Sequence, residues 1–418
     1  MPLLNFFLRE LKMQVILFED HYAKDLKPVT LTRVAFKIMM GGLDLEEAFR
    51  RKGIPVSYIV RDYLRPVLAL DIESAPIQDT EIMFVNACLA PYLKDMYETL
   101  ALCEKKERFC AVRGERVLLS YFPKKKVRLE DLNMDNLADY MLQDNPPKIE
   151  EKFYLLTRPY EIIKFNMAII TDNLERLIET FHRYDRDVYV GNNVRLSHWV
   201  GIDTSEGPII IDDNAFVDTF VHLRGPLYIG KNSRINEHSI IKDRCSVGNT
   251  VKMGGEIEAS IIESFSNKQH HGFLGHAYLG SWINIGAGTC NSDLKNTYGE
   301  VKVMHNGAKE KTGMQFLGCI IGDYSKTAIN SCIFTGKVIG VSSMVYGYAT
   351  SNVPSFTNWA KSLGSVTKYN LEAALLTQKR MFARRKIEQK PAHIEMMKEA
   401  YRLTEDEHGT YPDKPLDL

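Results

Sequence analysis

Aliphatic residues recur at every sixth position in the second half of the chain. The run from 211 to 253 holds eight of them in succession, and the period returns from 321 to 345; the eight are Ile211, Val217, Leu223, Ile229, Ile235, Ile241, Val247 and Met253. Neither an α-helix nor a simple alternating strand has a period of six. The pattern predicts a solenoid in which three short strands form one triangular coil of about 18 residues, with the aliphatic side chains stacked inside.

The first part of the chain has a different pattern. Short apolar runs at 14–18 and 55–60 predict strands, and the spacing at 43–52 predicts a helix between them. Such βα alternation is typical of an α/β domain. We therefore expect an α/β domain over 13–185, whose last helix covers 173–184, and a β-helix over 186–352. A helical segment follows over 353–403, with a helix at 368–390 that Pro391 ends, and a polar, flexible tail over 404–418.

Composition narrows the class of protein. Fifty-three basic residues balance 53 acidic ones, so a general nucleic-acid binder is not expected. No apolar run reaches 18 residues, which argues against a membrane span, and the start MPLLNFFLRELK does not resemble a signal peptide. Seven cysteines without a CxxC pair suggest reduced thiols and a cytoplasmic protein.

The six-residue period breaks between 254 and 320, where polar side chains are dense. A solenoid that interrupts its repeat often presents a binding loop there, although a tolerated surface insertion is the alternative. The segment SNKQHHGFLGHAYLGSWINIGAGTCNSDLKNTYGEVKV (266–303) resembles the acetyltransferase half of the bifunctional GlmU family, and it is similar to GlmU-like sugar nucleotidyltransferases. The resemblance implies a left-handed β-helix, a homotrimer with sites between subunits, and acetyl-CoA or another acyl-CoA as co-substrate.

The resemblance also implies which residues catalyse acyl transfer. His270 aligns with the family's catalytic histidine, and a neutral imidazole can take a proton from an amine as that amine attacks a thioester. Glu256, fourteen residues earlier, aligns with the glutamate that orients the histidine. The alternative for His270 is an ordinary surface-loop histidine.

Other positions of the motif imply contacts with a sugar substrate. Phe273 aligns with a substrate-contacting tyrosine, and Asn284 and Asn291 align with asparagines that bind the sugar and its amine. The alternative for each asparagine is a β-helix corner or a stacking ladder. The family's phosphate-binding lysine is replaced by Glu258, so Lys268 is the candidate cation for a phosphate; otherwise the acceptor is not a sugar 1-phosphate.

Four further residues are expected to bind the co-substrate. The backbone N–H of Ala287 aligns with the donor that polarises the thioester carbonyl, and Gly347 aligns with the coenzyme A channel. The basic run at 379–386 includes Arg384 and Arg385, which are candidates for the phosphates of coenzyme A or of a nucleotide. A solvated helix face is the alternative for this run.

The N-terminal region lacks the glycine-rich Gly-x-Gly-Thr-Arg loop of GlmU-type nucleotidyltransferases. The corresponding stretch is FEDHYAKDLKPVTLTRVAFKIMMGG (18–42), in which Glu19, Asp20 and Arg33 are the remaining candidates for a nucleotide site. Asp20 is the candidate ligand for Mg²⁺, which is required only if this domain is active. A structural domain without activity is the alternative.

Taken together, these patterns predict a transferase. The favoured function is acyl-CoA-dependent N-acylation of an amino sugar or sugar phosphate, in the synthesis of nucleotide sugars or cell-envelope precursors. A sugar-1-phosphate nucleotidyltransferase, alone or bifunctional, and a non-catalytic β-helix scaffold are the alternatives. The sequence names neither the sugar nor the acyl group.

Overall fold

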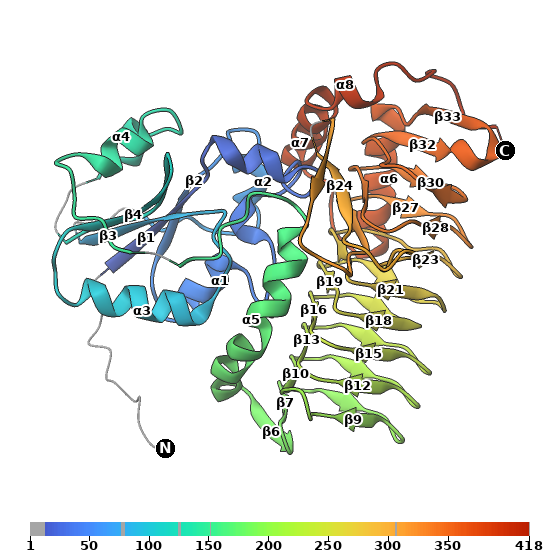
Figure 1. Cartoon of the computed structure of the whole chain (residues 1–418), viewed down its shortest axis with the longest axis horizontal. Helices are drawn as coiled ribbons and strands as arrows, with labels where there is room; N and C mark the ends of the chain where they lie inside the picture. The colour runs from blue at the N-terminus through green and yellow to red at the C-terminus, as the bar shows by residue number, and fades with distance from the viewer. Residues whose placement is uncertain (1–12, 77–79, 124–126, 151, 306, 418) are drawn as a thin grey trace.

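The N-terminal half forms a small α/β domain in the computed structural model, which describes residues 13–417 except 77–79, 124–126, 151 and 306 (Figure 1). Its sheet has the order β2-β1-β3-β5-β4, in which β1 is parallel to β2 and β3, while β5 is antiparallel to β3 and β4. The strands are β1 (Met13–Phe18), β2 (Val56–Ile59), β3 (Glu81–Asn86), β4 (Phe109–Arg113) and β5 (Arg116–Phe122). Each residue of β1 is buried, which explains its mostly apolar sequence, and the amide of the one polar residue, Gln14, donates to the hydroxyl of Ser57 at 2.7 Å.

Helices connect and cover this sheet. They are α1 (Leu45–Arg50), α2 (Arg65–Leu68), α3 (Leu93–Cys103), α4 (Leu137–Leu142) and the long α5 (Glu161–Leu177). Asp44 caps α1 by accepting a hydrogen bond from the backbone N–H of Glu47, at 2.8 Å. The helix predicted at 173–184 is displaced: α5 ends at Leu177, and His182–Asp185 forms strand β6.

The second half is the predicted solenoid of parallel strands (Figure 1). Its first face is one sheet, to which β6 adds an antiparallel edge strand. The strands of this face are β7 (Val188–Val190), β10 (Ile209–Ile211), β13 (Leu227–Ile229), β16 (Cys245–Val247), β19 (Ile261–Ile262), β22 (Tyr278–Leu279), β26 (Cys319–Ile321) and β29 (Lys337–Ile339).

The second face runs from β8 to β20 and continues beyond single bridges at Asn284. It consists of β8 (Arg195–Leu196), β11 (Phe216–Val217), β14 (Arg234–Ile235), β17 (Lys252–Met253), β20 (Asn267–Lys268), β27 (Lys326–Thr327), β30 (Met344–Val345), β32 (Thr357–Ala360) and β33 (Ser365–Lys368). The third face consists of β9 (Gly201–Asp203), β12 (His222–Arg224), β15 (Ile240–Lys242), β18 (Glu256–Glu258), β21 (Phe273–Gly275), β23 (Cys290–Asn291), β28 (Cys332–Ile333) and β31 (Tyr348–Ala349).

The aliphatic residues of the six-residue period lie inside the coils, as predicted. All eight from Ile211 to Met253 are completely buried and belong to one hydrophobic cluster. Since about 25 cal/mol is gained per Å² of apolar surface removed from water, this stack is the main stabilising feature of the solenoid. The fold class predicted from the period is confirmed.

The first face joins the two halves of the chain. Its outward side chains Ile210, Tyr228 and Tyr278 belong to the same buried cluster as Val15 and Leu17 of β1. Helix α5 lies along this face, between the solenoid and the α/β domain (Figure 1). The two halves of the chain therefore share one hydrophobic core.

Part of the interrupted segment forms a hairpin of β24 (Lys302–His305) and β25 (Ala308–Lys311). It is tied to the α/β domain by Arg158, whose guanidinium donates to both carboxylate oxygens of Glu310, at 2.7 and 3.1 Å. This part of the interruption is thus a structural contact. None of the described helices is long and apolar enough to cross a membrane.

The C-terminal segment forms α6 (Leu371–Arg384), α7 (Pro391–Arg402) and the short α8 (Glu405–His408). The prediction that Pro391 ends a helix is wrong: α6 ends at Arg384, and Pro391 begins α7, where its missing N–H costs nothing. His408, within the segment expected to be a flexible tail, is completely buried and its ring contacts Phe356.

Candidate functional site

His270 lies at the corner where the second face turns into the third, a region called here the His270 corner. Its side chain is exposed. Its backbone is held from inside the coil, because the buried ammonium of Lys268 donates to the carbonyl oxygens of His270, at 2.6 Å, and Gly254, at 2.9 Å. The imidazole is therefore open to solvent on a fixed backbone.

Ala287 occupies the same corner in the next coil. The N–H of Gly288 donates to the carbonyl of His271 at 3.1 Å, which places the two coils in direct register. The carbonyl of Ala287 accepts from Asn330 at 2.7 Å, but its N–H has no acceptor among the described residues. Gly347 lies at this corner one coil beyond Asn330, with φ +74°. One edge of the solenoid thus holds the predicted base His270, the predicted carbonyl donor Ala287 and the predicted channel residue Gly347.

The predicted contact between Glu256 and His270 is not formed. Glu256 lies on the third face, where its carboxylate accepts from Lys242 at 2.9 Å, and Lys242 also pairs with Glu258 at 3.1 Å. Lys268 likewise does not reach the surface, since its side chain is 1% exposed. Burial lowers the pKa of Lys268 to about 8. Lys268 therefore supports the corner from within, and its expected phosphate contact has no geometric support.

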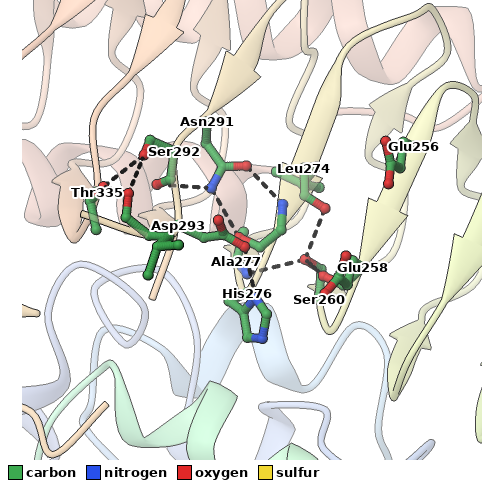
Figure 2. A network of polar contacts seen from close by, with 12 residues as sticks. Glu256, Glu258, Ser260, Leu274, His276, Ala277, Asn291, Ser292, Asp293 and Thr335 are labelled. Atoms are coloured by element: carbon green, nitrogen blue, oxygen red, sulfur yellow. Dashed lines mark hydrogen bonds and ion pairs between the residues drawn. The ribbon is translucent and has the colours of Figure 1, made fainter. Parts of the chain in front are cut away.

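Asn291 is used inside the solenoid. Its amide donates to the carbonyl of Gly275 and accepts from the N–H of the same residue, both at 2.9 Å, so it forms a ladder contact (Figure 2). The ring of Phe273 packs against Gly275, where an added Cβ would lie 2.4 Å from a ring atom of Phe273. Neither residue has a side-chain group free to bind the polar atoms of a sugar.

A carboxylate–imidazole pair that the sequence reasoning missed lies nearby. The Nδ1 atom of His276 is 2.8 Å from a carboxylate oxygen of Asp293 (Figure 2). The imidazole also stacks on Phe316, with ring centroids 5.3 Å apart. His276 is 7% exposed, at the corner between the third and first faces. Both residues belong to the 266–303 segment, so the motif contained the signal, but their spacing did not reveal the pairing.

Asn284, Arg384 and Arg385 converge on one cavity of about 280 Å³ between the second face and α6. Arg385 donates to the side-chain oxygen of Asn267 at 2.9 Å, which anchors the end of α6 to the solenoid. Gln269 also lines this cavity and directly precedes His270. Three residues predicted from separate parts of the sequence are thus brought together beside the His270 corner.

The N-terminal candidates are engaged within the protein. Glu19 is completely buried and accepts from Arg61, at 2.8 and 3.0 Å, and from the N–H of Ala35 at 2.9 Å. The two carboxylate oxygens of Asp20 bind Arg116 at 2.8 and 3.1 Å, and one also accepts from Asn86 at 2.8 Å.

These contacts leave little capacity for a metal ion. The oxygens of Asp20 already bind a guanidinium and an amide, so this carboxylate does not fit the role of a Mg²⁺ ligand. No cluster of three or more His, Cys, Asp or Glu side chains able to hold a metal ion occurs within the described part of the chain. We therefore assign no step to a metal.

Arg33 binds the solenoid instead of facing an open cleft. Its guanidinium pairs with Glu263 at 3.0 Å and with Asp323 at 3.1 Å, and it donates to the hydroxyl of Ser281 at 2.7 Å. Thr32 donates to Asp323 at 2.8 Å, and the N–H of Met39 to Glu263 at 3.0 Å. The stretch at 18–42, where the sequence suggested a nucleotide site, thus fastens the α/β domain to the first face.

Parts of the chain are similar to known proteins. Residues 15–180 match the family of sugar nucleotidyl transferases. The bifunctional sugar-1-phosphate nucleotidylyltransferase/acetyltransferase of Sulfurisphaera tokodaii is 32% identical over 153 residues, which are 35% of this chain and 37% of that protein. The bifunctional protein GlmU of Rippkaea orientalis is 26% identical over 240 residues, 45% of this chain and 48% of that one. The chain is therefore similar to GlmU-type proteins over part of its length.

The resemblance stated from the 266–303 motif is thereby confirmed. The chain spans less than half the length of either curated relative. Among solved structures, the UDP-N-acetylglucosamine acyltransferase of Francisella novicida is 14% identical, with a TM-score of 0.33, and the match covers 54% of this chain and 94% of that one.

Proposed function

We propose that this chain transfers an acyl group from an acyl-CoA to the amino group of an amino sugar at the His270 corner. The observation that carries the proposal is the register of two adjacent coils, which places an exposed imidazole at His270 beside an unpaired backbone N–H at Ala287. Acyl transfer to an amine requires these two groups, a base for the amine proton and a donor for the carbonyl oxygen.

The chemistry divides between these groups. An acyl-CoA supplies a thioester carbonyl. The amine attacks that carbonyl carbon, so a C–N bond forms and the C–S bond breaks. His270 accepts the proton that the amine loses and returns it to the departing thiolate, while the Ala287 N–H stabilises negative charge on the carbonyl oxygen. Gly347 leaves this edge of the solenoid without a side chain. A Cβ at this position would lie 2.4 Å from the hydroxyl of Ser362.

The positions that align with the family's sugar-phosphate site hold no available cation, which favours an acceptor other than a sugar 1-phosphate. Glu258 stands where the family has a phosphate-binding lysine, and Lys268 is buried. Asn284, by contrast, is exposed and available to a sugar. We therefore propose a non-phosphorylated or nucleotide-linked amino sugar as the acceptor.

An acceptor panel tests the proposal. The full chain is incubated with acetyl-CoA and amino sugars that are free, 1-phosphorylated or nucleotide-linked, and both free thiol and the mass of the product are measured. The proposal predicts an N-acylated sugar and an equal amount of free coenzyme A. If no acceptor yields an acylated product with acetyl-CoA or longer acyl-CoAs, the proposal is wrong.

Exposed aromatic side chains lie at the same corner of the solenoid, in the coils that precede His270. Trp199 is 74% exposed and stacks on Phe220, which in turn stacks on His238, with ring centroids 5.2 Å apart in both pairs. Such an exposed apolar ridge is typical of a surface that a partner covers. We propose that two further copies of the chain cover it in a homotrimer, which places the His270 corner between subunits.

Charge on this ridge should break the trimer. The double substitution Trp199→Asp and Phe220→Asp is expected to leave a folded monomer, because burying two carboxylates in an apolar contact is strongly unfavourable. Sedimentation or light scattering measures the mass, and Tyr298→Asp, at an aromatic residue 70% exposed elsewhere, is the control. A wild-type chain that sediments at the monomer mass of 47.8 kDa contradicts the trimer.

The N-terminal domain is expected to transfer nucleotides weakly or not at all. Glu19, Asp20 and Arg33 are each bound by protein groups, so none is free for a triphosphate or its metal. Release of pyrophosphate from UTP, dTTP, CTP or ATP with sugar 1-phosphates measures this activity. Robust release that Asp20→Ala abolishes contradicts the expectation, with Asp62→Ala, at an exposed carboxylate of the same domain, as the control.

A further inference from the structure

The cavity beside α6 has a strong and uncompensated positive charge. Lys252, Lys326, Arg384 and Arg385 all line it, and none of its lining residues is acidic. Lys326 donates only to the backbone carbonyl of Tyr324, at 2.6 Å. Like charges gathered at a partly buried site repel one another, so the free cavity is electrostatically poised to take an anion.

Burial and neighbouring cations lower the pKa values of three of these groups. Burial lowers the pKa of Lys326 to about 7. Burial, then the nearby Arg385, Arg234 and Arg384, lowers that of Lys252, and burial with Arg384 lowers that of Arg385. An anion bound among them favours the charged form of each group.

An aromatic wall closes another side of the cavity. The rings of Phe265 and Trp282 are stacked, with centroids 4.5 Å apart and an angle of 5° between their planes, and Met381 of α6 lies among the lining residues. Aromatic and thioether groups beside cations are suited to a ligand that joins a planar heterocycle to phosphates. The volume of about 280 Å³ is near the lower end of the ~300–1,000 Å³ usual for small-molecule sites.

We infer that this cavity binds a nucleoside diphosphate group, with its phosphates among Lys252, Lys326 and the two arginines and its base against the Phe265–Trp282 wall. Because Gln269 lines the cavity and His270 follows it, the group attached to the diphosphate is directed towards the His270 corner. Two substrates of the proposed reaction contain this chemistry: the nucleotide end of the acyl-CoA and a nucleotide-linked amino sugar. Their identity as substrates rests on the proposed function, whereas binding in the cavity does not.

Calorimetry with the full chain tests the inference. UDP, dTDP, ADP, adenosine 3′,5′-bisphosphate and coenzyme A are titrated into wild type and into Lys326→Met and Arg384→Ser. Each substitution removes one charged contact, so the dissociation constant should rise about 10- to 100-fold. Arg380→Ser, on the exposed face of α6 and outside the cavity, should bind as wild type does.

The pattern of ligands separates the two sources. Binding of UDP or dTDP that the cavity variants weaken assigns the cavity to the acceptor's nucleotide. If the cavity variants weaken only the binding of coenzyme A and of adenosine 3′,5′-bisphosphate, the cavity is assigned to the acyl-CoA donor. The inference is overturned if no nucleotide binds to wild type, or if both variants bind like wild type. Acyl transfer is measured in parallel, so nucleotide binding without transfer refutes the proposed function alone.

The binding should also weaken as the pH rises from 7 to 9. The lowered pKa of Lys326 means that this lysine loses its proton over the lower part of that range in the free protein, whereas the bound anion favours the protonated form. Binding therefore takes up a proton, which titrations in buffers of different ionisation enthalpy detect. Lys326→Met should reduce this uptake, and an unchanged uptake in the variant contradicts the role given to Lys326.

Discussion

Substituting His270 by alanine is expected to lower kcat for acyl transfer by about 10²–10⁴, the usual contribution of general-base catalysis. The side chain is exposed and makes no hydrogen bond within the described residues, so its removal should leave the fold and the proposed trimer unchanged. Free coenzyme A measured against time, with circular dichroism and sedimentation on the same samples, separates a loss of chemistry from a loss of structure.

Two neighbouring histidines are the matched controls. His271→Ala should have a small effect, because its position in the motif is not the catalytic one. His276→Ala breaks the contact with Asp293 and should affect stability more than kcat. Glu256→Gln is expected to act like the wild type, since the carboxylate contacts Lys242 and not His270. A loss of turnover in His276→Ala combined with full activity in His270→Ala would assign the base to the other pair.

Replacing Arg33 by methionine should lower the free energy of unfolding by about 3–5 kcal/mol, which is typical when one partner of a buried ion pair is removed. Arg33 is 12% exposed, and the carboxylates of Glu263 and Asp323 that it binds are 5% and 6% exposed. The substitution leaves both carboxylates buried without their common cation. Because the contact joins the two halves of the chain, the α/β domain should also dissociate from the solenoid more readily.

Denaturant unfolding followed by fluorescence and circular dichroism measures this effect. Arg65→Met is the control, because Arg65 pairs with Asp62 at the surface of the same domain and exposed pairs contribute about 0–1 kcal/mol. Adding Glu263→Gln and Asp323→Asn to Arg33→Met should recover part of the loss. Equal unfolding of Arg33→Met and Arg65→Met would show that this contact does not hold the domains together.

The six-residue period was sufficient to predict the solenoid because each coil repeats the same inward positions. The same logic explains Lys268, which occupies the inward position beside Met253 in the neighbouring strand. Its place in the period was therefore a signal that the side chain is buried. The usual preference of lysine for the surface concealed that signal.

The contact expected between Glu256 and His270 fails for a related reason. Glu256 lies opposite Phe273 in the adjacent strand, so the coil here has 17 residues. His270, 14 positions after Glu256, therefore lies at the corner before β21 and not beside Glu256 in the adjacent coil. The pairing of these two residues was taken from the family resemblance, and a motif does not contain the length of this coil.

Contacts between distant segments were beyond sequence reasoning. The cavity joins residues of the second face to Arg384 and Arg385 on α6, about a hundred positions later. The docking of Arg33 on Glu263 and Asp323 likewise depends on how the two halves pack. Each candidate residue was visible in the sequence, but its partners were fixed only by the tertiary structure.

The most direct test of the central claim is rescue of His270→Ala by free imidazole. If His270 acts as the base, imidazole added to the variant should restore acyl transfer in proportion to its neutral form, because that form accepts the proton of the amine. Addition of imidazole to wild type or to His271→Ala should change the rate little. The account predicts this selective recovery of turnover; full activity of His270→Ala without imidazole would contradict it.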